Sequence, residues 1–257
     1  MTVIWKGDLF RFVKSKLFYG VAALTCLIAC SLMMLTRKDI RLGISIFGNL
    51  TAFKTMDDVL RIGVQYQKGL GILIAILLSV FIGQEYAWKT WQHKWIIEKS
   101  RKNIYISKAM LSSVVSTAVF LIFEGMALLC SGQIQNIFTD GYVAMVICGA
   151  FIYAALGSVI CMLSMLIKSN TASIIVCLGY VLFSETMVSI IKGIGGLTEM
   201  TARISEWIIR HSIYGMSLFV GGTSVSFTSI LPICINSVAI MFLSTVAGLF
   251  IFSKYEL

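Results

Sequence analysis

The stretch YVAMVICGAFIYAALGSVICMLSMLI occupies residues 142–167 and decides the fold class, because its 26 residues include no Asp, Glu, Lys or Arg. A helix needs about 20 consecutive apolar residues to cross the hydrocarbon core of a bilayer. Backbone polar groups inside lipid must be hydrogen-bonded within the protein, and a helix achieves this within one segment. The stretch is therefore predicted to be a membrane-spanning helix.

Five further apolar stretches flank this one, so most of the 257 residues are predicted to lie in lipid. Hydrophobic residues make up 58% of the chain and charged residues 13%, whereas a soluble domain carries roughly 25% charged residues. This composition disfavours a soluble helical bundle. We expect an all-α integral membrane protein with a single transmembrane domain, residues 1–257, and six spans at about 17–36, 66–83, 107–130, 142–167, 171–191 and 230–252.

Three shorter segments have amphipathic patterns. In residues 1–16, Trp5, Leu9 and Phe12 share one helical face among basic residues, which is typical of a helix lying in the headgroup layer. Thr55 is expected to cap an amphipathic helix over residues 56–64. Thr198 is expected to cap another helix within residues 192–228, which we predict to form an outer broken or re-entrant element.

The net charge of +9 is placed beside the apolar spans and not on a nucleic-acid-binding face. With six spans, both termini lie on one side of the membrane. The inner segments then hold 12 Lys and Arg and the outer segments 9. Basic residues favour the cytoplasmic side and contact anionic lipid, so both termini are predicted to be cytoplasmic.

The sequence offers no pattern typical of soluble catalysis. GxxxxGK[ST], HExxH and GxSxG are all missing, and the two histidines, His93 and His211, fall at predicted loop positions. The seven cysteines occur singly in or beside apolar runs without a CxxC pair. We therefore interpret them as small buried hydrophobes and expect neither a metal site nor a disulfide framework.

Two carboxylates interrupt predicted spans, Glu124 in the third and Glu185 in the fifth. A charge at a bilayer centre costs roughly 2.5–3.5 kcal/mol, which makes such residues functional candidates. Both lie toward the outer ends of their helices. The favoured interpretation is that they reach water or line an outer cavity, and direct handling of substrate or protons is the alternative.

The segment after the second span has the most distinctive local pattern. The apolar run is predicted to end at Gly83, and a polar, aromatic and basic helix follows on the cytoplasmic side. Such a helix suits either contact with a cytosolic partner or a connector with snorkelling Trp and Lys. The candidate contact residues are Gly83, Glu85, Tyr86, Trp88, Lys89, Thr90 and Trp91.

This segment resembles the first cytoplasmic loop of type 2 ATP-binding-cassette (ABC) exporter permeases, which often reads Phe-x-Gly-x-Glu-[Phe/Tyr]-x-x-Gly-Thr. Ser100-Arg101, Lys108 and the closing residues 252–257 are similar as well, and so is the layout of an interfacial helix with six spans. Lys89 departs from the pattern, because it replaces the usual glycine. The matching residues are Phe81, Gly83, Glu85, Tyr86 and Thr90.

The resemblance implies a half-transporter and not an enzyme. A second permease, identical or homologous, would pair with this chain, and two cytosolic ATPase subunits would bind ATP and Mg. The loop from Glu85 to Trp91 would receive the movement of the ATPase, while Glu124, Glu185 and Trp207 would belong to an outer gate or cavity.

Small permeases of this family often accompany export of, or immunity to, antimicrobial peptides, as in phenol-soluble modulin exporters and lantibiotic immunity systems. The expected cargo is therefore an amphipathic or antimicrobial peptide, and the expected location is the bacterial cytoplasmic membrane. Two alternatives stay open. An ion-coupled secondary carrier would have Gly-interrupted spans and mid-membrane carboxylates, and an intramembrane enzyme would need a catalytic cluster that the sequence lacks.

Overall fold

A computed structural model describes residues 2–38, 43–46, 49–52, 55–88, 90, 94, 100–132, 137–196, 198–222 and 227–254. The structure is almost entirely helical, as the sequence predicts. Its helices are α1 (Thr2–Val13), α2 (Lys16–Arg37), α3 (Met56–Val64), the 3₁₀ helix η1 (Tyr66–Lys68), α4 (Leu70–Ala87), α6 (Arg101–Ser131), α8 (Asp140–Ile167), α9 (Asn170–Leu182), α10 (Ser184–Gly195), α11 (Glu199–His211), α12 (Ile213–Gly222) and α13 (Phe227–Lys254).

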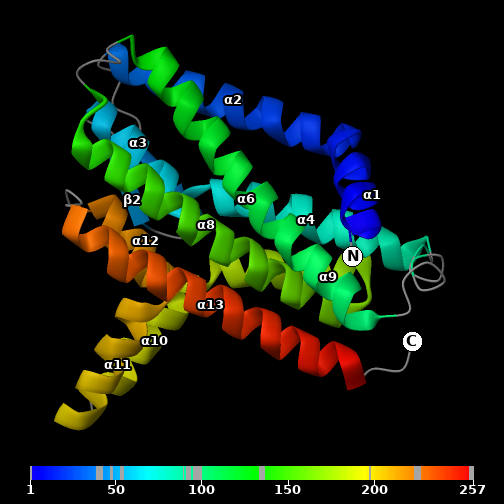
Figure 1. The fold of residues 1–257 in the computed structure, drawn as a ribbon. Coiled ribbons are helices and arrows are strands. Elements are labelled where there is room, and N and C mark those ends of the chain that lie inside the picture. The colour runs from blue at the N-terminus through cyan, green and yellow to red at the C-terminus, as the bar shows by residue number, and fades with distance from the viewer. Residues whose placement is uncertain are drawn as a thin grey trace.

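Long apolar helices form a bundle with α8 inside it (Figure 1). The helix α8 packs along both α6 and α13, α2 lies against α6, and α4 packs against α9. Tyr153, Leu156 and Ile160 of α8 are fully buried. Among the described residues, α2, α4, α6, α8 and α13 are each long and apolar enough to cross a membrane. These helices are those of a multi-pass membrane protein.

The two ends of the bundle differ. We call the end that holds α1, the last turns of α4, α8 and α13 and the first turns of α6 and α9 the termini end. The start of α1 and the end of α13 lie there (Figure 1). Tyr105 near the start of α6 and Phe252 near the end of α13 have ring centroids 5.9 Å apart. The opposite end, which holds α3, α10, α11 and α12, is the loop end. An even number of crossings explains why both termini share one end.

The fifth predicted span, at about 171–191, is a bent pair of helices. The helices α9 and α10 meet at Phe183 with an angle of 54° between them. The Ser184 hydroxyl donates to the Val181 carbonyl at 2.8 Å, and such local bonds compete with helix hydrogen bonds. Hydrophobicity along the chain does not predict this break by itself, because apolar residues resume at Met187 after the short polar stretch Ser184-Glu185-Thr186.

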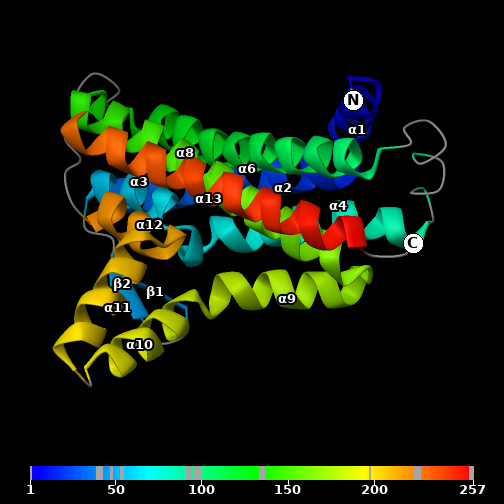
Figure 2. The same cartoon turned by 60° about the horizontal axis from the view of Figure 1, so that its bottom comes forward.

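Beyond the bend, α10 and α11 form a helical hairpin that projects from the bundle at the loop end (Figure 2). Gly195 makes the close approach possible, because an added Cβ there would lie 2.8 Å from the Cβ of Ser205. The predicted cap of α11 is confirmed, since the Thr201 N–H donates to Thr198 Oγ1 at 3.3 Å. The broken element predicted between spans five and six corresponds to α11 and α12. The helix is already interrupted earlier in the chain, at the bend at Phe183.

The helix α3 is packed into the loop end by its apolar stripe. The predicted Thr55 cap is confirmed as a reciprocal capping box with Asp58, at 2.9 and 3.3 Å. Val59, Leu60 and Val64 are buried against neighbours that include α6 and α12. Before it, β1 (Gly43–Ile46) and β2 (Asn49–Ala52) form an antiparallel hairpin in which Gly43 pairs with Ala52, an element that the sequence did not predict.

The second predicted span, 66–83, divides into η1 and α4. Gly69 separates them with φ of 148°, a conformation open to glycine and strained for other residues. The helix α4 then continues through Gly83 to Ala87. This corrects the expectation that the span ends at Gly83 and that a separate helix begins there.

Candidate functional site

Gly83 is a packing position inside α4 and not a helix end. An added Cβ at Gly83 would lie 2.8 Å from the Cα of Asn170, the first residue of α9. Real Cβ atoms do not approach a backbone that closely, so only glycine lets α4 and the start of α9 meet here. The glycine of the predicted motif therefore sets the distance between two helices at the termini end.

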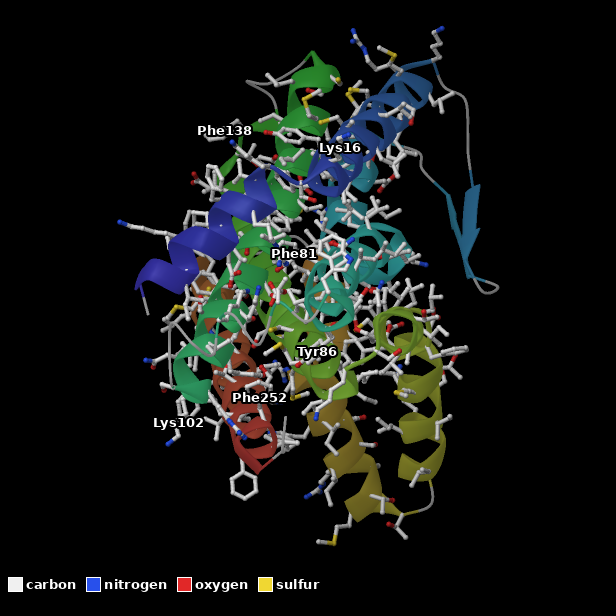
Figure 3. The ribbon with its side chains drawn as sticks, turned by 90° about the vertical axis from the view of Figure 1, so that its right-hand side faces the viewer. Lys16, Phe81, Tyr86, Lys102, Phe138 and Phe252 are labelled. Carbon is white, nitrogen blue, oxygen red and sulfur yellow. The ribbon has the colours of Figure 1, made fainter. Side chains whose placement is uncertain are left out.

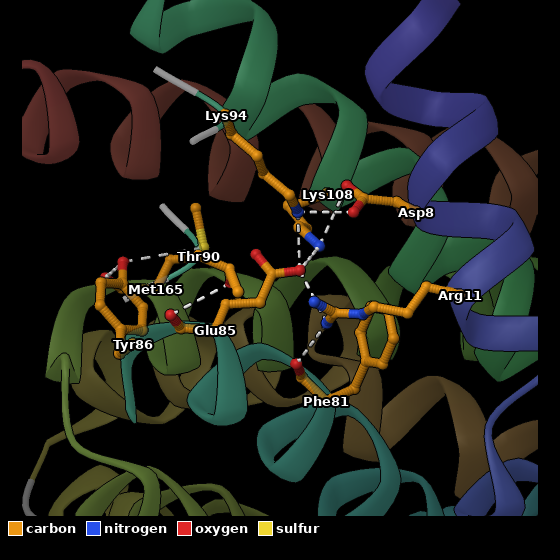
Figure 4. A network of polar contacts seen from close by, with 9 residues as sticks. All are labelled: Asp8, Arg11, Phe81, Glu85, Tyr86, Thr90, Lys94, Lys108 and Met165. Atoms are coloured by element: carbon orange, nitrogen blue, oxygen red, sulfur yellow. Dashed lines mark hydrogen bonds and ion pairs between the residues drawn. The ribbon is translucent and has the colours of Figure 1, made fainter. Parts of the chain in front are cut away.

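Glu85, one turn of helix closer to the end of α4 than Phe81, is fully buried and forms the centre of an ion-pair cluster (Figure 4). Its Oε1 lies 2.7 Å from Arg11 Nη2 of α1 and 2.7 Å from Lys94 Nζ. Lys108 Nζ of α6 donates to the same oxygen. One carboxylate oxygen thus links α1, α4, α6 and Lys94.

Asp8 of α1 supplies the second carboxylate of the cluster. Its Oδ1 accepts from Lys94 Nζ at 2.5 Å, and its Oδ2 lies 3.0 Å from Lys108 Nζ. Asp8 is 2% exposed and Lys108 is 1% exposed. A buried charge is costly unless it is paired. The two carboxylates face three cations, and this pairing offsets the cost of burying them.

The cluster changes the pKa values of Asp8 and Lys94, two members that lie outside the spans. Burial acts to raise the pKa of Asp8, but the charges and hydrogen bonds of Lys108 and Lys94 outweigh it and hold that pKa below its usual value of 3.8. For Lys94, burial and the neighbouring charge of Lys108 outweigh the two carboxylates and lower the pKa to about 8. Lys94 therefore loses its proton at a lower pH than an ordinary lysine does.

An aromatic ring covers one side of the cluster. The Arg11 guanidinium lies 4.2 Å from the centroid of the Phe81 ring, and Lys108 Nζ lies 4.8 Å from it. Arg11 also donates to the Phe81 carbonyl at 3.0 Å. Both contacts favour the cations in an otherwise apolar setting. Viewed from the termini end, Phe81 lies among the helices whereas Lys102 lies at the periphery (Figure 3).

The remaining residues of the predicted contact segment divide into inward and outward positions. The Tyr86 hydroxyl donates to the Met165 carbonyl of α8 at 2.9 Å, and Thr90 Oγ1 donates to the Glu85 carbonyl at 3.3 Å (Figure 4). Trp88 is 65% exposed. Lys89 and Trp91 lie outside the described residues. Among the predicted contact residues that are described, Trp88 presents the largest free surface to a partner.

Sequence reasoning selected Glu85 for its place in the motif but assigned it to a surface, and the structure corrects that assignment. Sequence reasoning also did not connect Asp8, Arg11 and Lys94 with Glu85. Two of these residues, Asp8 and Lys94, are 86 positions apart in the chain. One signal was available. Lys108 is followed in α6 by an uncharged run that extends to Glu124, and a lysine at the edge of such a run favours a carboxylate as partner.

Glu124 lies inside the protein and does not reach water, which corrects the favoured sequence interpretation. It is 2% exposed, and its Oε2 accepts from the Tyr142 hydroxyl of α8 at 3.4 Å. Its Oε1 lies against Gly63 of α3, where an added Cβ would overlap it. Within the described part of the chain, Oε1 has no hydrogen-bond partner. The packing of α3 over α6 buries this carboxylate.

Glu185 and Trp207 are separate from Glu124. Glu185 is half-buried in the first turn of α10, directly after the bend. Trp207 on α11 is 63% exposed, and its ring stacks on His211 with centroids 4.6 Å apart. The three residues thus lie on three different helices of the loop end, and the structure does not unite them in one cavity.

Comparison of the sequence with models of protein families and with curated proteins found no match. Within the described ranges, no group of three His, Cys, Asp or Glu side chains is placed to hold a metal ion. A functional interpretation therefore depends on the arrangement of the helices and on the cluster at the termini end.

Proposed function

We propose that this chain is the transmembrane permease subunit of an ATP-driven ABC exporter. The observation that carries the proposal is the placement of the segment from Phe81 to Trp88. It lies at the same end as the start of α1 and the end of α13, ends in the exposed Trp88, and joins α1, α6 and α8 through Glu85 and Tyr86. This is the place where a cytosolic ATPase would contact a permease of this layout.

The cluster supports a mechanical role for this segment. A push on Trp88 acts on α4 directly, because Trp88 follows the last residue of that helix. Glu85 carries the displacement to α1 and α6, and Tyr86 carries it to α8. Buried ion pairs resist separation, since breaking one leaves an unpaired charge in an apolar setting. Four helices would therefore move together when an ATPase below them changes shape.

The expected assembly has two such permeases, identical or homologous, above two ATPase chains that bind ATP and Mg. The proposed cargo is an amphipathic or antimicrobial peptide, moved out of the membrane or cytoplasm of a bacterium. The outer faces of α2 and α13 expose large apolar side chains, as lipid-facing helices do, among them Leu27, Met34, Leu231, Phe242 and Phe250.

Purification of the native complex from membranes in mild detergent tests this proposal. We expect an ATP-hydrolysing protein to copurify with the tagged chain, and intact-complex mass spectrometry to give two copies of it for two permeases. ATP hydrolysis is expected only in the complex. Recovery of a chain that moves cargo with no nucleotide-binding partner would refute the proposal.

Two exposed tryptophans at opposite ends of the bundle provide a matched control. Trp88→Ala removes the largest exposed side chain among the described residues of the contact segment and is expected to reduce copurification of the ATPase several-fold. Trp207→Ala removes a comparably exposed ring from the loop end and is expected to leave copurification unchanged. Equal behaviour of the two variants would contradict the assigned contact surface.

An ion-coupled secondary carrier is the second candidate, and the burial of Glu124 favours it. A membrane carboxylate without a cation partner among the described residues is a group that a coupling proton can occupy. In that case, Glu124→Gln abolishes dependence of transport on a proton gradient in reconstituted vesicles. Under the exporter proposal, transport requires ATP in the same vesicles and does not respond to the gradient.

A further inference from the structure

Two cysteines that are 100 positions apart in the sequence meet between α2 and α6. Cys30 Sγ of α2 and Cys130 Sγ of α6 are 3.1 Å apart, and both residues are half-buried. A disulfide has an S–S distance of about 2.0 Å. The sulfurs therefore need to approach by only about 1 Å to bond.

The helix backbones are held in register at this place by other contacts. Arg37 Nη1, at the end of α2, donates to the Cys130 carbonyl at 3.4 Å. The same guanidinium borders Gly132, which ends α6 in a left-handed conformation with φ of 67°. The packing of α2 along α6 therefore brings the two thiols together.

We propose that Cys30 and Cys130 are a disulfide-forming pair that links the first span to α6 at the loop end. This proposal does not depend on the exporter proposal. It reverses the expectation that all seven cysteines are only buried hydrophobes. The sequence could not suggest the pair, because each cysteine lies singly within an apolar helix.

The bond forms by thiol–disulfide exchange with a small disulfide, RSSR. One protein thiolate attacks RSSR, forms a mixed disulfide and releases one RSH. The second protein thiolate then attacks the protein sulfur of that mixed disulfide and displaces the second RSH. The two cysteines lose two electrons and two protons in total, and RSSR gains them as two RSH.

The link would complete a pattern of restraints on α6. At the termini end, Lys108 of α6 is paired with Asp8 and Glu85 of α1 and α4. At the loop end, the disulfide would join α2 to the same helix. In the oxidised chain α1 would then be fixed to α6 at the termini end and α2 at the loop end, and separation of α2 from α6 would require reduction.

Peptide mapping of the full-length chain tests the pair. Membranes holding the chain are treated with a small aromatic disulfide, free thiols are alkylated, and the digest is compared with a sample reduced by dithiothreitol. We expect a cross-linked peptide that joins Cys30 to Cys130 and disappears on reduction. Recovery of both residues as separate alkylated or mixed-disulfide peptides after oxidation would overturn the proposal.

Single substitutions provide the controls. Cys30→Ser and Cys130→Ser are each expected to abolish the link. Cys26→Ser, one helical turn earlier on α2 and equally half-buried, is expected to retain it. A link that survives Cys30→Ser and is lost in Cys26→Ser would also contradict the pair. Because the wild-type map is decisive by itself, poor folding of a variant does not remove the test.

Discussion

One carboxylate oxygen of Glu85 contacts three cations, and these contacts allow the charged side chain to be buried. A single buried ion pair seldom adds stability, because desolvation offsets the attraction of the charges. Here three donors from three parts of the chain share one acceptor. The shared carboxylate therefore specifies which helices meet at the termini end, whatever its net contribution to the free energy of unfolding.

We expect Glu85→Gln to lower the free energy of unfolding by about 3–5 kcal/mol, because it leaves buried cations without their main partner. Denaturant unfolding in detergent, followed by tryptophan fluorescence, measures the change. Glu206→Gln, which alters an exposed carboxylate of α11, is the control and should change stability little. Similar effects of the two variants would show that the cluster is not structural.

Asp8 makes the packing of α1 sensitive to acid. Its pKa in the folded chain is below 3.8, so the unfolded chain binds the proton more tightly than the folded one. The stabilisation from Asp8 is then fully present above pH 3.8 and is lost as pH falls through its folded pKa. The wild type should lose stability relative to Asp8→Asn as pH falls below about 4, measured by thermal unfolding across pH. Parallel curves would contradict this.

At the scale of elements, the α10–α11 hairpin depends on one close approach. Gly195 of α10 faces Ser205 of α11, whereas Gly193 on the same helix has open space where a Cβ would be added. The hairpin otherwise projects from the bundle, so its two helices have few contacts with other elements (Figure 2). Regions with few buried contacts open locally at low free energy.

This glycine pair provides a matched test. Gly195→Ala is expected to accelerate hydrogen exchange across residues 199–211 several-fold, because the added methyl group forces α10 and α11 apart. Gly193→Ala is expected to slow exchange or leave it unchanged, since alanine favours a helix by about 0.5–1 kcal/mol over glycine where space is free. Faster exchange in Gly193→Ala than in Gly195→Ala would exclude the proposed packing role.

At the scale of the whole molecule, the bundle has two chemically different ends. The termini end contains the ion cluster, and the loop end contains α3, the α10–α11 hairpin and the Cys30–Cys130 contact (Figure 1). Helices α2, α4, α6, α8 and α13 run between them, with the bent α9–α10 pair as the sixth. The two ends are therefore predicted to face opposite sides of the membrane.

Site-specific labelling tests that arrangement. Lys6→Cys on α1 and Glu206→Cys on α11 place new thiols at exposed positions of opposite ends. An impermeant maleimide should label Glu206→Cys from outside intact cells and Lys6→Cys only after permeabilisation. The native chain is the blank, because its seven cysteines are half-buried or buried. Labelling of both variants from one side would contradict a six-span topology.

Local signals in the sequence were sufficient for the elements. The length of uncharged stretches predicts the spans, because a helix alone can satisfy its backbone in lipid. The caps at Thr55 and Thr198 were equally readable, since a cap depends on residues three apart. The bend at Phe183 was not readable, because the short polar stretch Ser184-Glu185-Thr186 is followed by further apolar residues and does not by itself require a bend.

The sequence by itself determined that this is a helical membrane protein with most of its spans where their apolar lengths predict them, since that property belongs to each segment separately. Only the tertiary structure decided which charges meet. Asp8 and Lys108 require a partner for their burial, and Cys30 and Cys130 require a neighbour for their bond, yet each partner lies far along the chain. Helix packing brings these residues together, and a linear pattern does not encode which faces of the helices will meet.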